Sequence, residues 1–205
     1  MAGDVDSPLG LFVAVEGVDH AGKTTLTAAL AAALTARGLA VASRREPSAG
    51  PIGTQFRLWS AATPPMPAEA MALLSAADRH QQQADLSADL AAYAVVLSDR
   101  YYLSGLAYHR ADGIDLTRYA AFNTGIRRPD LYLVLDVDPA TASGRAGAPD
   151  GRWEQPALAH LLPGSYAEAV AHVVFCDRTP VHRLNANATA GDVLDYALSI
   201  VEGRL

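Results

Sequence analysis

The sequence contains a single cysteine, Cys176, among its 205 residues. One cysteine excludes an internal disulfide and is typical of proteins that work in a reducing compartment. No run approaches the ~18 consecutive apolar residues that a membrane-spanning helix needs. The first residues also lack the basic segment and apolar core of a signal peptide. We therefore expect a cytoplasmic protein that does not interact with a membrane.

Basic residues are also few, because 16 Lys and Arg stand against 22 Asp and Glu, for a formal net charge of −6. A protein that coats nucleic acid gains its affinity by neutralising phosphates, so this balance argues against nucleic acid as a partner. It does not exclude a local basic pocket for one small anion. Half of the residues are hydrophobic, which at this length suffices for one substantial core.

Short apolar runs alternate with helical segments along the whole chain. Runs of about five apolar residues predict buried strands, and such strands between helices predict a parallel sheet covered on both faces. The expected strands are 11–16, 39–43, 94–98, 131–136 and 181–185. The expected helices are 23–37, 54–61, 67–90, 102–108, 116–124, 166–175 and 189–203. We predict one α/β domain over residues 1–205, with a polar, Gly- and Pro-rich lid at about 144–155.

The segment Gly17-Val18-Asp19-His20-Ala21-Gly22-Lys23-Thr24 matches the phosphate-binding pattern G-x-x-x-x-G-K-[ST]. Its two glycines let the backbone wrap around phosphates, and the helix that begins there adds partial positive charge. Lys23 is expected to neutralise the β- and γ-phosphate oxygens of ATP, and the Thr24 hydroxyl to bind Mg²⁺. The pattern lies between a predicted strand and a predicted helix, as this mechanism requires. We therefore predict a P-loop NTPase-type three-layer αβα sandwich with about five parallel strands, and ATP and Mg²⁺ as cofactors.

Asp99 and Arg100 directly follow the predicted strand at 94–98. Ligands of α/β proteins bind at the carboxyl ends of the strands. An aspartate there can orient Mg²⁺, and an arginine can hold a phosphoryl group with two hydrogen bonds. Beside a P-loop, this pair predicts a phosphotransfer site. Judged on the sequence alone, Arg57 and Arg79 are typical of solvated surface arginines.

Six segments, in order, resemble the thymidylate kinase family over nearly the whole chain. They are VEGVDHAGKTT, REPSAGPIGTQFR, LLSAADRHQ, LSDRYYLSGLAYH, RPDLYLVLDVDP and DGRWEQ. They are similar to the family's P-loop, the loop after its second strand, its long-helix Asp-Arg segment, its Asp-Arg-Tyr motif, its fourth strand and the Arg-aromatic-Glu of its lid. The resemblance implies an ATP-dependent nucleoside-monophosphate kinase with dTMP as the default acceptor. It also implies a homodimer formed through helices beside the active site.

The resemblance implies roles for the residues around the phosphates. The whole loop from Gly17 to Thr24 holds ATP, and Asp99 joins Thr24 in organising Mg²⁺. Three arginines contact the acceptor phosphate: Arg45, Arg57 and Arg100. The residues with an implied catalytic role are Lys23, Asp19, Arg100 and Arg152. Arg152 enters with the lid at the transition state, where closure excludes water, and Arg145 is the alternative lid arginine.

The resemblance also implies contacts to the nucleoside: Arg79 reaches the base, and Tyr108 packs on the sugar and disfavours a 2′-hydroxyl. Three neighbouring positions depart from the family pattern. Ser75 stands where a phenylalanine usually stacks on thymine, and Gly105 and His109 replace the usual Ser or Thr and the usual Gln. Losing an aromatic platform weakens stacking on a base. We expect Ser75→Phe to sharpen the preference for dTMP, unless His109 or Tyr102 already fills that space.

Three alternatives to dTMP phosphorylation follow. The altered base contacts favour, as a second hypothesis, a kinase of the same fold that acts on another nucleotide or nucleoside. A third hypothesis is a nucleotide-binding protein without turnover, and the retained Lys23, Asp99, Arg100 and Arg152 argue against it. A GTPase is the weakest alternative, because the sequence has no N-K-x-D-type guanine signal.

Overall fold

A computed structural model describes residues 9–146 and 151–205 of the chain. Within these residues, five parallel strands form one sheet in the order β2-β3-β1-β4-β5. The strands are β1 (Leu11–Glu16), β2 (Val41–Arg45), β3 (Val95–Asp99), β4 (Leu131–Asp136) and β5 (Val181–Asn185). β3 pairs with β1, and Val15 is level with Asp99. The segments that follow these two strands therefore meet at one edge of the sheet.

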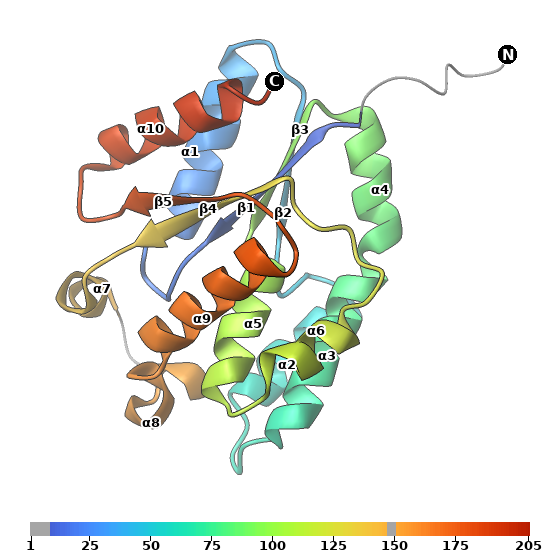
Figure 1. Cartoon of the computed structure of the whole chain (residues 1–205), viewed down its shortest axis with the longest axis vertical. Coiled ribbons are helices and arrows are strands. Elements are labelled where there is room, and N and C mark those ends of the chain that lie inside the picture. Colours follow the sequence, from blue (N-terminus) through green and yellow to red (C-terminus); the bar gives the residue numbers. More distant parts are fainter. Residues whose placement is uncertain (1–8, 147–150) are drawn as a thin grey trace, which may run out of the picture.

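Helices cover both faces of the sheet (Figure 1). On one face, α1 (Lys23–Ala36) and α10 (Ala190–Glu202) lie side by side. On the other face, α5 (Tyr102–Ala111) packs along α9 (Leu162–Phe175). The predicted three-layer sandwich with five parallel strands is confirmed.

Two apolar cores follow from the alternation of side chains along each strand. In β1, Phe12 and Ala14 belong to the core under α5 and α9, whereas Val13 and Val15 belong to the core under α1 and α10. All four side chains are at most 1% exposed. A strand buried on both faces explains why the sequence shows continuous apolar runs rather than alternation with polar residues.

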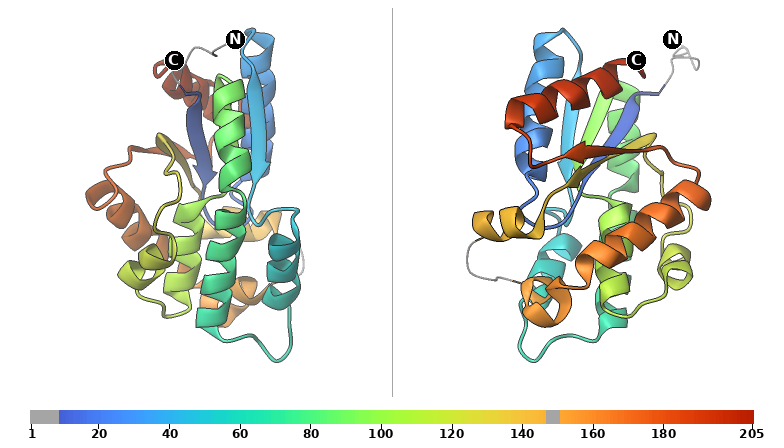
Figure 2. Two further views of the ribbon diagram at one scale, coloured as in Figure 1. Left: turned by 90° about the vertical axis from the view of Figure 1, so that its right-hand side faces the viewer. Right: turned by 60° about the vertical axis from the view of Figure 1, so that its left-hand side comes forward.

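The remaining helices lie beyond the carboxyl ends of the strands or along the sheet. They are α2 (Pro51–Ser60), α3 (Ala68–Gln81), α4 (Gln83–Ala92), α6 (Leu116–Phe122), α7 (Pro139–Arg145), the 3₁₀ helix η1 (Arg152–Glu154) and α8 (Pro156–Ala159). Figure 2 shows α2, α3 and α8 at the end of the molecule away from α1 and α10. No helix in the described ranges is long and apolar enough to cross a membrane.

Several expected boundaries are wrong. The single helix expected over 67–90 is broken at Gln82, where the side-chain amides of Gln82 and Gln83 donate to the carbonyls of Asp78 and Arg79. β2 begins two residues late, because its register is decided by pairing with β3. α2 begins early, at Pro51, since a proline loses no hydrogen bond at the first helical position.

The lid expected at about 144–155 is only partly described. It contains the end of α7 and the whole of η1, two short helices that the sequence analysis missed. Its residues 147–150 lie outside the described ranges. The lid and the single domain over 1–205 therefore stay predictions.

Candidate active site

A cavity of about 690 Å³ lies among the segments that follow β1, β2 and β3, together with α2, α3 and α5. It brings together most of the side chains expected to bind nucleotides. These lining residues are Asp19, His20, Gly22, Lys23, Thr24, Arg45, Arg57, Ser75, Arg79, Asp99, Arg100, Gly105, Tyr108, His109 and Arg145. Of the other predicted residues, Gly17 and Val18 line a neighbouring cavity, Ala21 is buried, and Arg152 lines neither cavity.

The P-loop backbone has a conformation that needs glycine at its start. Gly17 has φ +141°, and a Cβ there would lie 2.8 Å from the Leu135 carbonyl oxygen. Lys23, at the first position of α1, donates from Nζ to the Val18 carbonyl oxygen at 2.5 Å. Burial, followed by the charge of Arg100, lowers the pKa of Lys23 to about 7. A phosphate group beside this buried ammonium would favour its charged form.

The expected metal-binding pair is assembled. The Thr24 hydroxyl donates to Oδ2 of Asp99 at 2.6 Å, and Asp99 is 4% exposed. Mg²⁺ commonly takes one or two protein oxygens and fills its other positions with phosphate oxygens and water, so this pair fits the ion. Within the described residues, no three His, Cys, Asp or Glu side chains gather to make an all-protein metal site.

Asp19 links the P-loop to the arginine after β3. Its carboxylate accepts hydrogen bonds from Arg100 and, at 2.6 Å, from the Tyr108 hydroxyl. Burial opposes ionisation of Asp19, but the charges of Arg100 and Lys23 and the bond from Tyr108 outweigh it and hold its pKa below the ordinary value. Arg100 itself has φ +67°, a strained conformation for a non-glycine residue. Asp19 thus holds Arg100 and Tyr108 in fixed orientations at the cavity wall.

Glu16, the last residue of β1, is a site residue that was not predicted from the sequence. This side chain is 0% exposed and accepts hydrogen bonds from the backbone N–H groups of Tyr101, at 2.8 Å, and Ser104, at 3.2 Å. The Glu16 carboxyl also accepts a hydrogen bond from the Ser104 hydroxyl. The Ser104 oxygen in turn accepts a hydrogen bond from Arg100 at 3.1 Å. Burial raises the pKa of Glu16 to about 7. The available signal was a glutamate that ends an apolar run directly before the P-loop.

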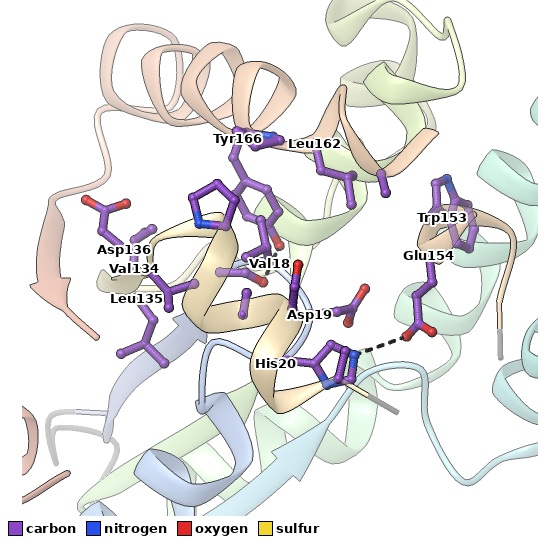
Figure 3. A pocket seen from close by; sticks show the side chains of 18 of the residues that line it. Val18, Asp19, His20, Val134, Leu135, Asp136, Trp153, Glu154, Leu162 and Tyr166 are labelled. Carbon is purple, nitrogen blue, oxygen red and sulfur yellow. Dashed lines mark hydrogen bonds and ion pairs between the residues drawn. The ribbon is translucent and has the colours of Figure 1, made fainter. Parts of the chain in front are cut away.

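A second cavity, of about 340 Å³, lies behind the P-loop between β4 and α9 (Figure 3). Tyr166 of α9 forms one wall and donates from its hydroxyl to the Gly17 carbonyl oxygen at 2.8 Å. Figure 3 shows His20 and Glu154 facing each other, with Nε2 and Oε1 3.7 Å apart. This contact ties η1 to the P-loop.

Arg79 is only 2% exposed, so the expectation that it is a solvated surface residue is wrong. Its guanidinium donates to both carboxylate oxygens of Glu46, to Oδ1 of Asn123 at 2.6 Å and to the Tyr119 hydroxyl at 3.1 Å. These partners satisfy a buried charge that would otherwise be costly. Arg57 differs: it is exposed, as expected, although it also lines the cavity.

The base-pocket positions that depart from the family pattern touch one another. Ser75 lies one helical turn before Arg79 on α3, and both line the cavity. The Ser75 hydroxyl is 2.9 Å from Nε2 of His109 and 2.9 Å from the hydroxyl of Tyr119. Burial and the charges of Arg79 and Arg152 lower the pKa of His109 to about 3, so its ring is neutral.

The 3₁₀ helix η1 contributes an aromatic side chain to the cavity. Trp153 stacks on Phe56 with ring centroids 5.7 Å apart and meets Tyr108 and His109 edge-on, each at 5.6 Å. The neighbouring Arg152 does not line the cavity. Its guanidinium is 3.0 Å from Asp112 and donates to the Met66 carbonyl oxygen at 2.7 Å. Arg145, the alternative lid arginine, does line the cavity and donates to the Ala186 carbonyl oxygen at 3.2 Å.

Comparisons with known proteins agree with this arrangement. A family model described as thymidylate kinase matches residues 15–157. The thymidylate kinase of Xanthomonas euvesicatoria pv. vesicatoria (strain 85-10) is 38% identical over 97% of this chain and 86% of its own length. That of Xylella fastidiosa (strain M12) is 35% identical over 95% of this chain and 88% of its own length.

The solved structure of a thymidylate kinase of broad substrate specificity from Candida albicans shares the fold, with a TM-score of 0.81. It is 22% identical in sequence, and the match covers 97% of this chain and 93% of that one. The fold, the assembled phosphate-binding residues and the identity to curated relatives lead to one conclusion. This chain belongs to the thymidylate kinase family.

Proposed function

We propose that the chain transfers the γ-phosphoryl group of ATP to dTMP and so produces dTDP and ADP. One observation carries the proposal: the residues expected to bind phosphate and those expected to contact the base line a single cavity. Lys23, Thr24 and Asp99 are the first group, and Arg79 with Ser75 is the second. Family membership supplies the nature of the reaction.

The residues at the phosphate end can align two phosphoryl groups. The P-loop N–H groups and Lys23 hold the β- and γ-phosphates of ATP. Thr24 and Asp99 would hold Mg²⁺, which would supply positive charge that neutralises the phosphate oxygens. Arg45, Arg57 and Arg100 contact the acceptor phosphate from the opposite side. Phosphoryl transfer needs little else, because its catalysis consists mainly of positioning and charge neutralisation.

The hydrogen bonds of Arg79 favour a base with a carbonyl group. An arginine has five N–H donors. Four of them are used by Glu46, Tyr119 and Asn123, which leaves one donor on Nη2. Thymine offers a carbonyl oxygen to such a donor, whereas cytosine presents an amino group at the same ring position. This supports dTMP over dCMP.

The test is a coupled ATP assay across dTMP, dUMP, dCMP, dGMP and dAMP. We expect the highest kcat/KM for dTMP. Ser75 and Gly105 favour a second candidate function, phosphorylation of a different nucleotide by the same machinery. A strong preference for another monophosphate would establish that second function. Binding of ATP without turnover of any acceptor would instead identify a nucleotide-binding protein.

We also infer a homodimer that works in the cytoplasm. The support for the dimer is exposed apolar surface on two helices that pack together, since Leu58 of α2 is 63% exposed and Leu73 of α3 is 48% exposed. The support for the compartment is the free, exposed Cys176, which is typical of a reducing environment. Light scattering during gel filtration measures the molar mass of the protein in solution and so distinguishes a dimer from a monomer. The dimer should dissociate in Leu73→Glu, and a wild-type monomer would contradict it.

A further inference from the structure

The side chain of Tyr119 reaches the place where residue 105 would have a side chain. Tyr119, on α6, is 1% exposed. A Cβ on Gly105 of α5 would lie 2.0 Å from the Tyr119 hydroxyl oxygen and 2.7 Å from its Cζ. Real Cβ atoms do not approach other atoms so closely. Tyr119 can therefore occupy its position only because residue 105 has no side chain.

The Tyr119 hydroxyl has a defined hydrogen-bond direction. It is 3.1 Å from Nη1 of Arg79 and 2.9 Å from Oγ of Ser75. An arginine can only donate, so the tyrosine oxygen accepts from Arg79. Its own proton is then available for Ser75. The hydroxyl thus connects two residues that line the cavity, although Tyr119 itself is not among the lining residues.

The donor and the acceptor can also be assigned in the hydrogen bond between Ser75 and His109. The Ser75 oxygen has one proton and lies 2.9 Å from both the Ala72 carbonyl oxygen and His109 Nε2. The Ala72 carbonyl can only accept, so it must take the Ser75 proton. Only one arrangement of protons then makes the contacts of Ser75 with Ala72, Tyr119 and His109 all hydrogen bonds. In it, Ser75 donates to Ala72 and accepts from Tyr119 and from His109 Nε2–H. His109 Nδ1 is then a buried acceptor with no hydrogen-bond partner among residues 9–146 and 151–205.

We propose that Tyr119 is a positioning residue for base recognition: its hydroxyl holds Arg79 and Ser75, and Ser75 in turn holds His109 in its Nε2–H tautomer. This inference rests on the proposed dTMP kinase function. The resulting site presents the remaining Arg79 donor to the base. It suits a base with a carbonyl group at that ring position, as thymine and uracil have. Cytosine has an amino group there.

The first experiment compares Tyr119→Phe with Tyr102→Phe. The control residue is a neighbouring, fully buried tyrosine whose hydroxyl has no hydrogen-bond partner in the described part of the chain. We expect Tyr119→Phe to raise the KM for dTMP about tenfold, the usual scale for losing a hydrogen bond to a charged group. The KM for ATP and kcat should stay within about twofold, the kcat/KM ratio of dTMP over dCMP should fall, and Tyr102→Phe should change none of these values. A wild-type KM for dTMP in Tyr119→Phe, or equal changes in both variants, would overturn the proposal.

The second experiment tests the packing. Gly105→Ser alone should lower Tm sharply, because its side chain overlaps Tyr119. Adding Tyr119→Leu should recover most of the loss, as expected for two residues in contact. Tolerance of Gly105→Ser in the presence of Tyr119 would contradict the arrangement.

The third experiment needs no turnover, so its failure can be distinguished from failure of the proposed function. Nitrogen-15 NMR of the histidine rings, with His109 assigned through His109→Gln, reports which ring nitrogen carries the proton. We expect protonated Nε2 in the wild type and in Tyr119→Phe, in which Ser75 still donates to Ala72, and a mixture of tautomers in Ser75→Ala. A wild-type His109 protonated at Nδ1 would overturn the proposal even if dTMP is the substrate. Protonated Nε2 together with preference for another monophosphate would support Tyr119 as the positioning residue and remove only the assignment to dTMP.

Discussion

Nη2 of Arg152 lies 3.0 Å from Oδ1 of Asp112, a carboxylate of which only 1% is exposed. Burial raises the pKa of Asp112, and the charge of Arg152 partly offsets that effect. The pair joins η1 to the end of α5. The family resemblance implies that Arg152 contacts the transferred phosphoryl group. To make that contact, Arg152 must first leave Asp112.

This relationship yields a prediction that separates two roles of Arg152. If Arg152 acts on the transition state, Arg152→Ala should lower kcat by ~10³-fold with a smaller effect on KM. Asp112→Asn removes the same ion pair but leaves the arginine in place, so its kcat should fall only a few-fold. Steady-state kinetics on both variants make the comparison. Equal losses would show that Arg152 serves only to pair with Asp112, and Arg145→Ala would be the next variant to measure.

The structure argues against the expectation for Ser75→Phe. Ser75 lines the cavity, but its hydroxyl contacts both His109 and Tyr119 at 2.9 Å. A ring there breaks these bonds and overpacks the region, which typically costs about 1–3 kcal/mol. We expect kcat/KM to fall for every monophosphate and Tm to decrease. Ser75→Ala, which removes the hydroxyl without adding bulk, is the control. A sharper dTMP preference at unchanged Tm would restore the interpretation based on the sequence.

Lys23→Ala should abolish phosphotransfer without destabilising the protein. Lys23 is buried, and burial together with Arg100 lowers its pKa to about 7, so its charge adds little to the stability of the empty protein. Activity and Tm are the measurements. Lys23 is also the only lysine in the sequence, so mass spectrometry after amine labelling can report its protection by ATP and Mg²⁺. Normal turnover in a folded variant would rule out the P-loop assignment.

Glu16 should make stability depend on pH. Its folded pKa is raised from 4.5 to about 7. Between these values the unfolded chain has released the proton that the folded protein still binds, so the free energy of unfolding falls as pH rises through this window. The shift corresponds to at most about 3 kcal/mol. Urea unfolding at pH 5, 6, 7 and 8 should show this decline in the wild type and a flatter profile in Glu16→Gln. Parallel profiles would contradict the raised pKa.

The sequence by itself determined the features that depend on neighbouring residues. The apolar run Leu11–Glu16 is a strand with the predicted bounds, because five buried residues in succession suit a strand covered on both faces. The phosphate loop was also predictable from the sequence, because its glycines and Lys23 act through local backbone geometry. The last helix begins where the sequence predicts it, and the Thr189 hydroxyl caps it by accepting from the Asp192 N–H. Each of these signals lies within a few consecutive positions.

Only the tertiary structure decided which distant side chains meet. Arg79 was expected at the surface, but it pairs with Glu46, 33 positions away, and with Asn123, 44 positions away. Gly105 lacks a side chain because Tyr119 of another helix fills its space. Local patterns do not encode such pairings, since they depend on how α3, α5 and α6 pack on one another. A buried charge or hydroxyl is stable only where that packing supplies its hydrogen-bond partners.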